Sequence, residues 1–126
     1  MKLLITGAGG QLGKEWVDFC KDHEVSYNSF SSNELDITDE DKVAKVIADV
    51  APDVLINCAA YTKVDEAEDN KQTALKINAE SVKKLANICN RNNVKLVHYS
   101  TDYVFAGNKS DKENSPEGYK EEDSTD

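Results

Sequence analysis

The stretch of sequence that decides the fold is residues 2–13, KLLITGAGGQLG. Its first part, residues 2–6, contains an unbroken apolar run, which is typical of a strand buried on both faces. Glycines follow at once, and an amphipathic helical pattern begins after them. The apolar side of that helix is expected to comprise Leu12, Trp16, Phe19 and Cys20. A buried strand, a glycine turn and a helix in this order predict the start of a βαβ unit.

Three glycines in the turn, Gly7, Gly10 and Gly13, keep the spacing GxxGxxG. Gly7 suits a sharp turn out of the strand, Gly10 the close approach of a diphosphate, and Gly13 the tight packing of helix on strand. We expect the backbone N–H groups of Gly10, Gln11 and Leu12 to point at the phosphates of a dinucleotide, with the helix dipole behind them. The alternative is a tight turn with a purely structural role.

The rest of the chain continues the alternation of strand and helix. Further strands are expected over residues 24–30, 35–37, 54–56 and 94–100. A second helix is expected to begin near Thr38 and to end at Pro52, and a third to cover roughly residues 65–92. This order predicts an α/β fold, a doubly wound parallel sheet of the Rossmann type, over residues 1–106. Residues 107–126 are polar and acidic, and we expect a loop or tail there.

The composition excludes several classes of function. The chain has 126 residues, enough for one domain with a core, and 39% of them are apolar. No apolar run approaches the ~20 residues of a membrane-spanning helix, and the N-terminus does not resemble a signal peptide. A net charge of −9 argues against nucleic acid and anionic membranes as partners, but backbone N–H groups can still bind an anionic ligand. The three cysteines lack metal-binding spacings, so no metal site is predicted, and free thiols in a cytoplasmic protein are expected.

The end of the second expected strand bears on the choice of cofactor, because ligands bind at the carboxyl ends of parallel strands. Residues 30–33, Phe-Ser-Ser-Asn, include neither the Asp or Glu that would grip a ribose diol nor the Arg that would favour a 2′-phosphate. Glu34 comes slightly late for that role. NADH and NADPH are therefore both candidate cofactors.

Small residues and hydroxyls follow the strand at residues 54–56. Ala59 and Ala60 leave room for a bulky ligand against the backbone, and Tyr61 and Thr62 place hydroxyls near a ribose. Ordinary packing of a strand into a loop is the alternative. Asn78, on the helix face expected to pack on the sheet, either fixes a strand end beside the cofactor or is a satisfied polar group of the core.

The last expected strand ends in two hydroxyls and a carboxylate, Ser100, Thr101 and Asp102. They come where a nicotinamide ring would lie, and a hydroxyl there can hydrogen-bond the substrate oxygen during hydride transfer. A cluster of capping side chains is the alternative. His98 is expected near the site but outside it, and His23 in a loop, so neither is assigned a catalytic role.

Five stretches of the sequence together resemble the dTDP-4-dehydrorhamnose reductase family. They are MKLLITGAGGQLG, LDIT, PDVLINCAAYTKVDEAE, INAESVKKLA and VHYSTDYVFAG. The glycine turn alone, in the form TGxxGxxG, is similar to that of the wider short-chain dehydrogenase/reductase superfamily. Residues 57–68 followed by 100–105 are the specific part. The resemblance covers residues 1 to about 107.

The resemblance implies a reaction. It implies an NAD(P)-dependent oxidoreductase that transfers hydride to C4 of dTDP-4-dehydro-6-deoxy-L-mannose and so forms dTDP-L-rhamnose. A nucleotide sugar is then the substrate, and a homodimer is a candidate state of the full-length protein. Thr101 matches the Ser/Thr of the family's catalytic set, and Thr101 and Asp102 would face the sugar.

The same resemblance implies contacts with the nucleotide. Asp36 and Ile37 would contact adenine, and the alternative for Asp36 is a cap on the helix that begins near Thr38. Residues 60–62 would line the ribose region with Tyr99 nearby.

One element of the family pattern is absent from these 126 residues: no tyrosine is followed four positions later by lysine. In the family, the tyrosine of a Tyr-x-x-x-Lys motif donates the proton and the lysine lowers its pKa. The motif follows an acidic segment that corresponds to residues 121–126, so we expect the chain to stop just short of it and to be inactive alone. A non-catalytic NAD(P)-binding regulatory subunit and a nucleotide-sugar epimerase or dehydratase are the alternatives.

Overall fold

A computed structural model of the chain describes residues 1–60, 71–101, 105 and 119–125. Its core is one parallel sheet of four strands in the order β2-β1-β3-β4. The strands are β1 (Lys2–Thr6), β2 (Ser26–Phe30), β3 (Val54–Asn57) and β4 (Lys95–His98). The registers pair Leu4 with Asn28 and with Leu55, and Leu55 in turn with Leu96. The predicted doubly wound α/β fold is confirmed.

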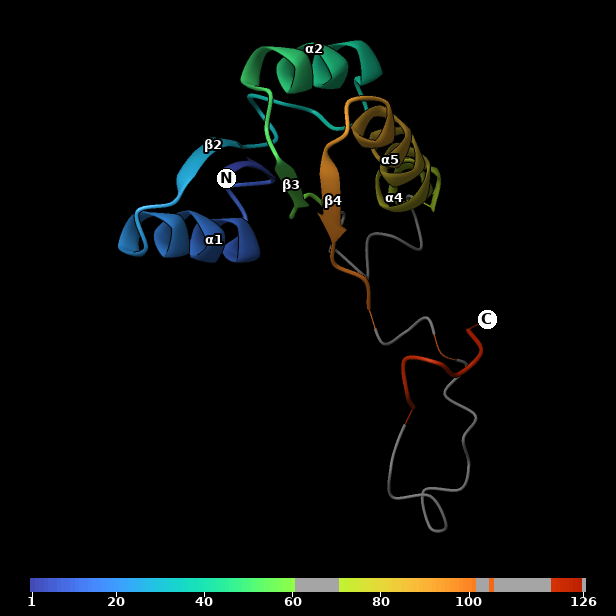
Figure 1. The fold of residues 1–126 in the computed structure, drawn as a ribbon. Helices are drawn as coiled ribbons and strands as arrows, with labels where there is room; N and C mark the ends of the chain where they lie inside the picture. Colours follow the sequence, from blue (N-terminus) through green and yellow to red (C-terminus); the bar gives the residue numbers. More distant parts are fainter. Residues whose placement is uncertain (61–70, 102–104, 106–118, 126) are drawn as a thin grey trace.

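Helices cover both faces of the sheet (Figure 1). They are α1 (Gln11–Asp22), α2 (Glu40–Val50), α4 (Lys71–Leu75), the π-helical segment η1 (Lys76–Glu80), and α5 (Ser81–Arg91). One face of the sheet packs on α1, and the opposite face packs on α2 and α5. This arrangement follows from right-handed crossovers between parallel strands, which place successive helices on either side according to strand order.

Alternate residues of β1 supply the two halves of the core. Leu4 is fully buried among side chains of α2 and α5, including Ile47 and Leu85. Leu3 and Ile5 point the other way and pack with Cys20 of α1. Because successive side chains of a strand face opposite sides, a strand covered on both faces must be apolar at every position.

The prediction of a strand over residues 35–37 is wrong. These residues form an irregular connection, although Leu35 and Ile37 are buried at 1% and 5% exposure. Both are apolar because they pack against the core, with Leu35 beside Leu4 and Val43, and not because they belong to the sheet. Burial without strand pairing has the same apolar signature in sequence as a short buried strand.

The predicted buried face of α1 is confirmed at Trp16 and Cys20, which pack on the core. It is wrong at Leu12 and Phe19, which are 38% and 46% exposed, and Gly13 is buried instead. The helix turns its glycine side toward the sheet because only Gly13 allows the close approach described below. Exposure of Phe19 is reduced by its edge-to-face contact with Trp16 and its stacking on His23.

The prediction that Asn78 packs on the sheet is also wrong, because Asn78 is exposed. Asn78 lies within the wide turn of η1, and at the end of that turn the Ser81 hydroxyl donates to the carbonyl of Lys76 at 2.7 Å. One extra residue in a turn rotates the preceding residues by about 100° about the helix axis. Ser81, at 1% exposure, and Leu85 therefore face the core in its place.

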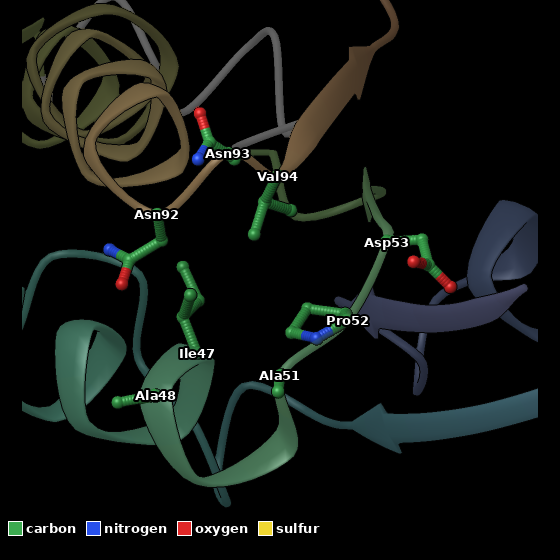
Figure 2. Close-up of a pocket in the computed structure, with 8 residues that line it drawn as sticks. All are labelled: Ile47, Ala48, Ala51, Pro52, Asp53, Asn92, Asn93 and Val94. Carbon is green, nitrogen blue, oxygen red and sulfur yellow. The ribbon is translucent and has the colours of Figure 1, made fainter.

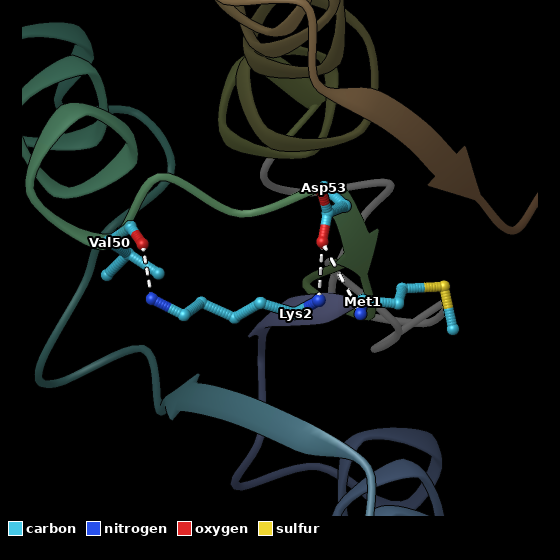
Figure 3. Close-up of polar contacts among 4 residues, drawn as sticks. All are labelled: Met1, Lys2, Val50 and Asp53. Carbon is cyan, nitrogen blue, oxygen red and sulfur yellow. Dashed lines mark hydrogen bonds and ion pairs between the residues drawn. The ribbon is translucent and has the colours of Figure 1, made fainter.

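The N-terminus is tied to the far end of the sheet (Figure 3). The Lys2 N–H donates to Asp53 Oδ2 at 2.6 Å, and the Met1 amino group lies 3.9 Å from the same oxygen. The Lys2 ammonium donates to the Val50 carbonyl at 2.9 Å, in the last turn of α2. These contacts hold the start of β1 against the connection that enters β3. Within the described part of the chain, no helix is both long and apolar enough to cross a membrane.

Candidate functional site

The strand order reverses at β1, since the chain runs from β1 to β2 on one side and returns to β3 on the other. A pocket of about 490 Å³ opens at the carboxyl ends of these three strands. It is lined by residues from the glycine turn, the end of β2, the connection after it, the end of β3, and η1. They are Gly7, Gly9, Gly10, Ser31, Ser32, Asn33, Leu35, Asp36, Ile37, Cys58, Ala59, Ala60 and Ile77. Such a reversal point is where doubly wound sheets bind nucleotides.

Two glycines of the turn are required by its geometry. Gly7 has φ +69°, and a Cβ there would lie 2.5 Å from the Ala59 nitrogen and 2.6 Å from the Cys58 carbonyl carbon. A Cβ on Gly13 would lie 2.3 Å from the Gly7 carbonyl oxygen. The turn is therefore packed backbone to backbone against both the end of β3 and the first turn of α1.

The N–H groups at the start of α1 are arranged differently from the prediction in one respect. The Gly10 N–H donates to the Gly7 carbonyl at 3.0 Å, so it closes the turn and does not project from it. Gly10 is the N-cap, and its carbonyl accepts from Lys14 N–H at 3.0 Å. Gln11 and Leu12 begin the helix, where N–H groups have no intrahelical partner.

Two carboxylates sit beside the end of β2. Glu34 Oε2 accepts from both the N–H and the hydroxyl of Ser31, at 2.8 and 2.7 Å, and these bonds lower the pKa of Glu34. Asp36 Oδ1 accepts from the Thr38 N–H at 2.8 Å. Asp36 lines the pocket, and its bond to the Thr38 N–H also stabilises the connection between β2 and α2. The N-cap of α2 is Asp39, which accepts from Lys42 N–H.

A hydrogen-bonded chain of side chains joins the ends of three strands. Asn57, 1% exposed, accepts the Thr6 hydroxyl at 2.7 Å and the Ala59 N–H at 3.2 Å through Oδ1. Its Nδ2 lies 3.0 Å from His98 Nδ1. Because Oδ1 faces a backbone donor, Nδ2 must be the donor to His98, whose Nδ1 is then unprotonated. Sequence reasoning missed this role of Asn57 and His98, and a polar residue ending an apolar strand was the only signal.

Partial burial lowers the pKa of His98, and the bond from Asn57 requires the same neutral ring. A lowered pKa in the folded state stabilises the fold above the unfolded pKa of ~6.5, and that stability is lost as the pH falls through the folded pKa. We therefore expect the difference in unfolding free energy between wild type and His98→Gln to shrink as the pH falls from 7.5 to 5. Urea unfolding across that range measures it, with His23→Gln as the matched control. A difference that stays constant with pH would contradict the expectation.

The end of β4 brings Tyr99 to α1. The Trp16 indole N–H donates to the Tyr99 hydroxyl at 2.9 Å, and Tyr99 remains 44% exposed. Thr101 is exposed just beyond the strand. Three predicted site residues, Tyr61, Thr62 and Asp102, lie outside the described residues. The arrangement of hydroxyls proposed for this edge therefore stays a prediction.

The three cysteines are free thiols, with Cys20 and Cys89 buried and Cys58 partly buried. Cys58 lines the pocket, and burial raises its pKa to about 11, so it is a neutral thiol at physiological pH. The described residues include no group of three His, Cys, Asp or Glu side chains placed to hold a metal ion.

A second hollow, of about 330 Å³, lies at the opposite edge of the sheet, between the ends of α2 and α5 (Figure 2). It is lined by Ile47, Ala48, Ala51, Pro52, Asp53, Asn92, Asn93 and Val94. The side-chain Nδ2 of Asn92 donates to the Ile88 carbonyl at 2.8 Å. None of the predicted site residues lines this hollow, so the candidate site is the pocket at the carboxyl edge.

Comparison with known proteins gives a consistent result. A family model described as the RmlD substrate binding domain matches residues 1–126. A dTDP-4-dehydrorhamnose reductase of Aggregatibacter actinomycetemcomitans is 46% identical over 125 residues, which cover 97% of this chain and 40% of that protein. The chain thus spans well under half the length of this relative.

Solved structures agree with that relationship. A dTDP-4-dehydrorhamnose reductase of Bacillus anthracis, in complex with NADP, matches with a TM-score of 0.80 and 42% identity, over 84% of this chain and 38% of that one. A dTDP-4-dehydrorhamnose reductase of Clostridium acetobutylicum matches with a TM-score of 0.85 and 39% identity, over 100% of this chain and 43% of that one.

Proposed function

Since this chain belongs to the family described as the RmlD substrate binding domain, we propose that it forms the NAD(P)H-binding part of a dTDP-4-dehydrorhamnose reductase. The observation that carries the proposal is the pocket at the reversal of strand order. Its lining includes the glycine turn that immediately precedes helix α1. The Bacillus anthracis reductase, 42% identical, is in complex with NADP, which supports a nicotinamide nucleotide as the ligand.

The residues present fit such a nucleotide. Gly10 is exposed and lines the pocket, and a Cβ on it would meet nothing nearer than the Gly7 carbonyl oxygen at 3.4 Å, so there is space beside it. We propose that the diphosphate takes that space and accepts from the first-turn N–H groups of Gln11 and Leu12. Gly7 and Gly13 hold the turn in place. Adenine would lie by Asp36 and Ile37, which line the same pocket.

At the other end of the pocket, Ala59 and Ala60 are proposed to face the nicotinamide ribose, with Tyr61, Thr62 and Tyr99 close by. Bound NAD(P)H supplies the hydride for reduction of a ketone. We propose that Thr101 holds the ketone oxygen of the sugar and that Asp102 binds the sugar. The whole protein would reduce C4 of dTDP-4-dehydro-6-deoxy-L-mannose to give dTDP-L-rhamnose.

The proton for the ketone oxygen needs a separate donor. These 126 residues contain no Tyr-x-x-x-Lys, and they span 40% of the Aggregatibacter reductase. We propose that the remainder of the whole protein supplies the tyrosine and the lysine. Residues 1–106 would then be the nucleotide-binding part, and residues 107–126 the acidic segment that precedes the motif. On this proposal the 126 residues bind NAD(P)H without turning it over.

A substitution at Gly10 tests the proposal. Gly10→Val puts a branched side chain into the space assigned to the diphosphate, while the backbone of Gly10, with φ −78°, accepts any residue. We expect affinity for both NADH and NADPH to fall at least tenfold, measured by calorimetric titration, with the thermal midpoint changed by only a few degrees. Unchanged affinity in a folded Gly10→Val chain would refute the assigned site, and absence of binding to the wild type would refute the function.

A further inference from the structure

We propose that His98 is a positioning residue for the nucleotide pocket, and that its neutral ring holds the pocket wall at Ala59 through the side chain of Asn57. The inference rests on the proposed function, because it concerns how tightly the same pocket holds its nucleotide as the pH changes. His98 is not among the described residues that line the pocket. It acts through one intervening side chain, and protonation of its ring weakens binding.

Three polar side chains stand in one row across the carboxyl ends of three neighbouring strands. The sheet register pairs Thr6 of β1 with Asn57 of β3, and Asn57 with His98 of β4. All three point to the face covered by α2 and α5, as do the leucines two positions before them. The Thr6 hydroxyl donates to Asn57 Oδ1 at 2.7 Å, and Asn57 Nδ2 lies 3.0 Å from His98 Nδ1. The row therefore links the edge strand β4 to the centre of the sheet.

Asn57 also holds the wall of the pocket. Its Oδ1 accepts the Ala59 N–H at 3.2 Å, and Ala59 lines the pocket. The Ala59 nitrogen lies so close to the glycine turn that a Cβ on Gly7 would be 2.5 Å from it. A shift of Ala59 therefore disturbs the turn that precedes α1, and the Asn57 amide, which is 1% exposed, opposes that shift.

The amide of Asn57 has one orientation that satisfies all of these neighbours. Its oxygen faces two donors, so its nitrogen must donate to an unprotonated His98 Nδ1. A proton on Nδ1 would bring two donors together. His98 would then swing away and leave a buried N–H without its acceptor, or the amide would turn over and withdraw its oxygen from Ala59. Both outcomes loosen the hold on Ala59. The His98 ring is exposed, so it can take up that proton from solvent.

In the described part of the chain, the elements packed against His98 present no second group that titrates near neutral pH. Those elements are β3 and α5. Burial raises the pKa of Cys58, after β3, and of Cys89, on α5, to about 11, so both stay neutral. The charged residues of α5 and β4 are all exposed, and they are Lys83, Lys84, Arg91 and Lys95. Lys84 pairs with Glu40 of α2 at 3.4 Å. Partial burial lowers the pKa of His98, which keeps its ring neutral above pH 7.

Calorimetric titration of the purified chain with NADH and with NADPH, at pH 8 and at pH 5.5, tests the proposal. Wild-type affinity should fall about three- to tenfold between the two, the range that one net hydrogen bond supplies. His98→Asn places an amide oxygen near the position of Nδ1, and this acceptor does not titrate. It should match the wild type within about twofold at pH 8 and keep that affinity at pH 5.5. The difference between the two proteins cancels any titration of the nucleotide itself.

His98→Leu removes the acceptor and should bind about three- to tenfold more weakly than the wild type already at pH 8, with no further loss at pH 5.5. His23→Gln is the matched control, because His23 is the other histidine of the chain and is the C-cap of α1. It should keep the full loss of the wild type between the two pH values.

Equal pH dependence in the wild type and His98→Asn, or a wild type that does not respond to pH, would overturn the role of His98 and leave the proposed function standing. The same holds if His98→Asn binds as weakly as His98→Leu at pH 8, because the acceptor would then be irrelevant. Failure of both nucleotides to bind the wild type at pH 8 would overturn both proposals.

Discussion

Gly7→Ala is expected to lower the free energy of unfolding by about 3 kcal/mol and to abolish measurable nucleotide binding. Two costs add at this position. An alanine at φ +69° is strained, and its Cβ would lie 2.5 to 2.7 Å from backbone atoms of Cys58 and Ala59. Backbone atoms at the end of β3 cannot rotate away as a side chain can. Relief requires the glycine turn to move away from the strand that forms the opposite wall of the pocket.

Urea unfolding and nucleotide titration measure the two effects. Gly9→Ala is the matched control in the same turn, because a Cβ there would be 3.5 Å from Ser31 Cβ, an ordinary contact. Its stability should stay within about 1 kcal/mol of the wild type. If Gly7→Ala were as stable as Gly9→Ala, the close approach of the turn to β3 would be wrong.

Asn57→Ala is expected to have a similar effect, with a loss of about 3 kcal/mol in the free energy of unfolding. The amide makes contacts with Thr6, Ala59 and His98, and the substitution removes all of them and leaves a cavity. The Thr6 hydroxyl, at 0% exposure, would be left without its acceptor. Nucleotide affinity should fall as well, because the Ala59 N–H that Asn57 holds belongs to the wall of the pocket.

A double substitution separates the unsatisfied hydroxyl from the cavity. In the Asn57→Ala background, Thr6→Val removes the buried hydroxyl and should recover about 1 kcal/mol, although it costs stability in the wild type. Equilibrium unfolding of the four proteins gives the coupling free energy. Strict additivity would mean that the bond between Thr6 and Asn57 contributes nothing, contrary to the geometry.

Much of the fold is predictable from local pattern. The continuous apolar runs at residues 3–5 and 54–56 identify strands buried on both faces, and the structure has β1 and β3 at those places. The stripe that includes Val43 and Ile47 identifies α2. The mistaken strand at residues 35–37 shows the limit of such patterns. Two apolar residues around a polar one occur both in a strand and in an irregular segment that packs on the core.

The site divides in the same way. Its place was predictable, because the glycine turn opens a helix after an N-terminal strand and the alternating elements predict a parallel sheet. The partners inside it were not. That the Gly10 N–H turns back to Gly7 and that Glu34 accepts from Ser31 depend on the detailed geometry of two turns, and that Asn57 bonds to His98 depends on the pairing of β3 with β4.

The sequence by itself determined the alternation of strands and helices, apart from the mistaken strand at residues 35–37, their parallel arrangement, and the edge at which the pocket lies. Those properties follow from the periodicity of apolar residues and from glycine spacing, both of which are local in the chain. Tertiary structure alone decided that Gly13 and not Leu12 or Phe19 is buried in α1, that η1 leaves Asn78 exposed, and which N–H groups remain for a nucleotide. The reason is steric: these outcomes depend on how closely separate pieces of backbone approach, as at Gly7 and Gly13, where a Cβ would clash with backbone atoms of Ala59 and of Gly7.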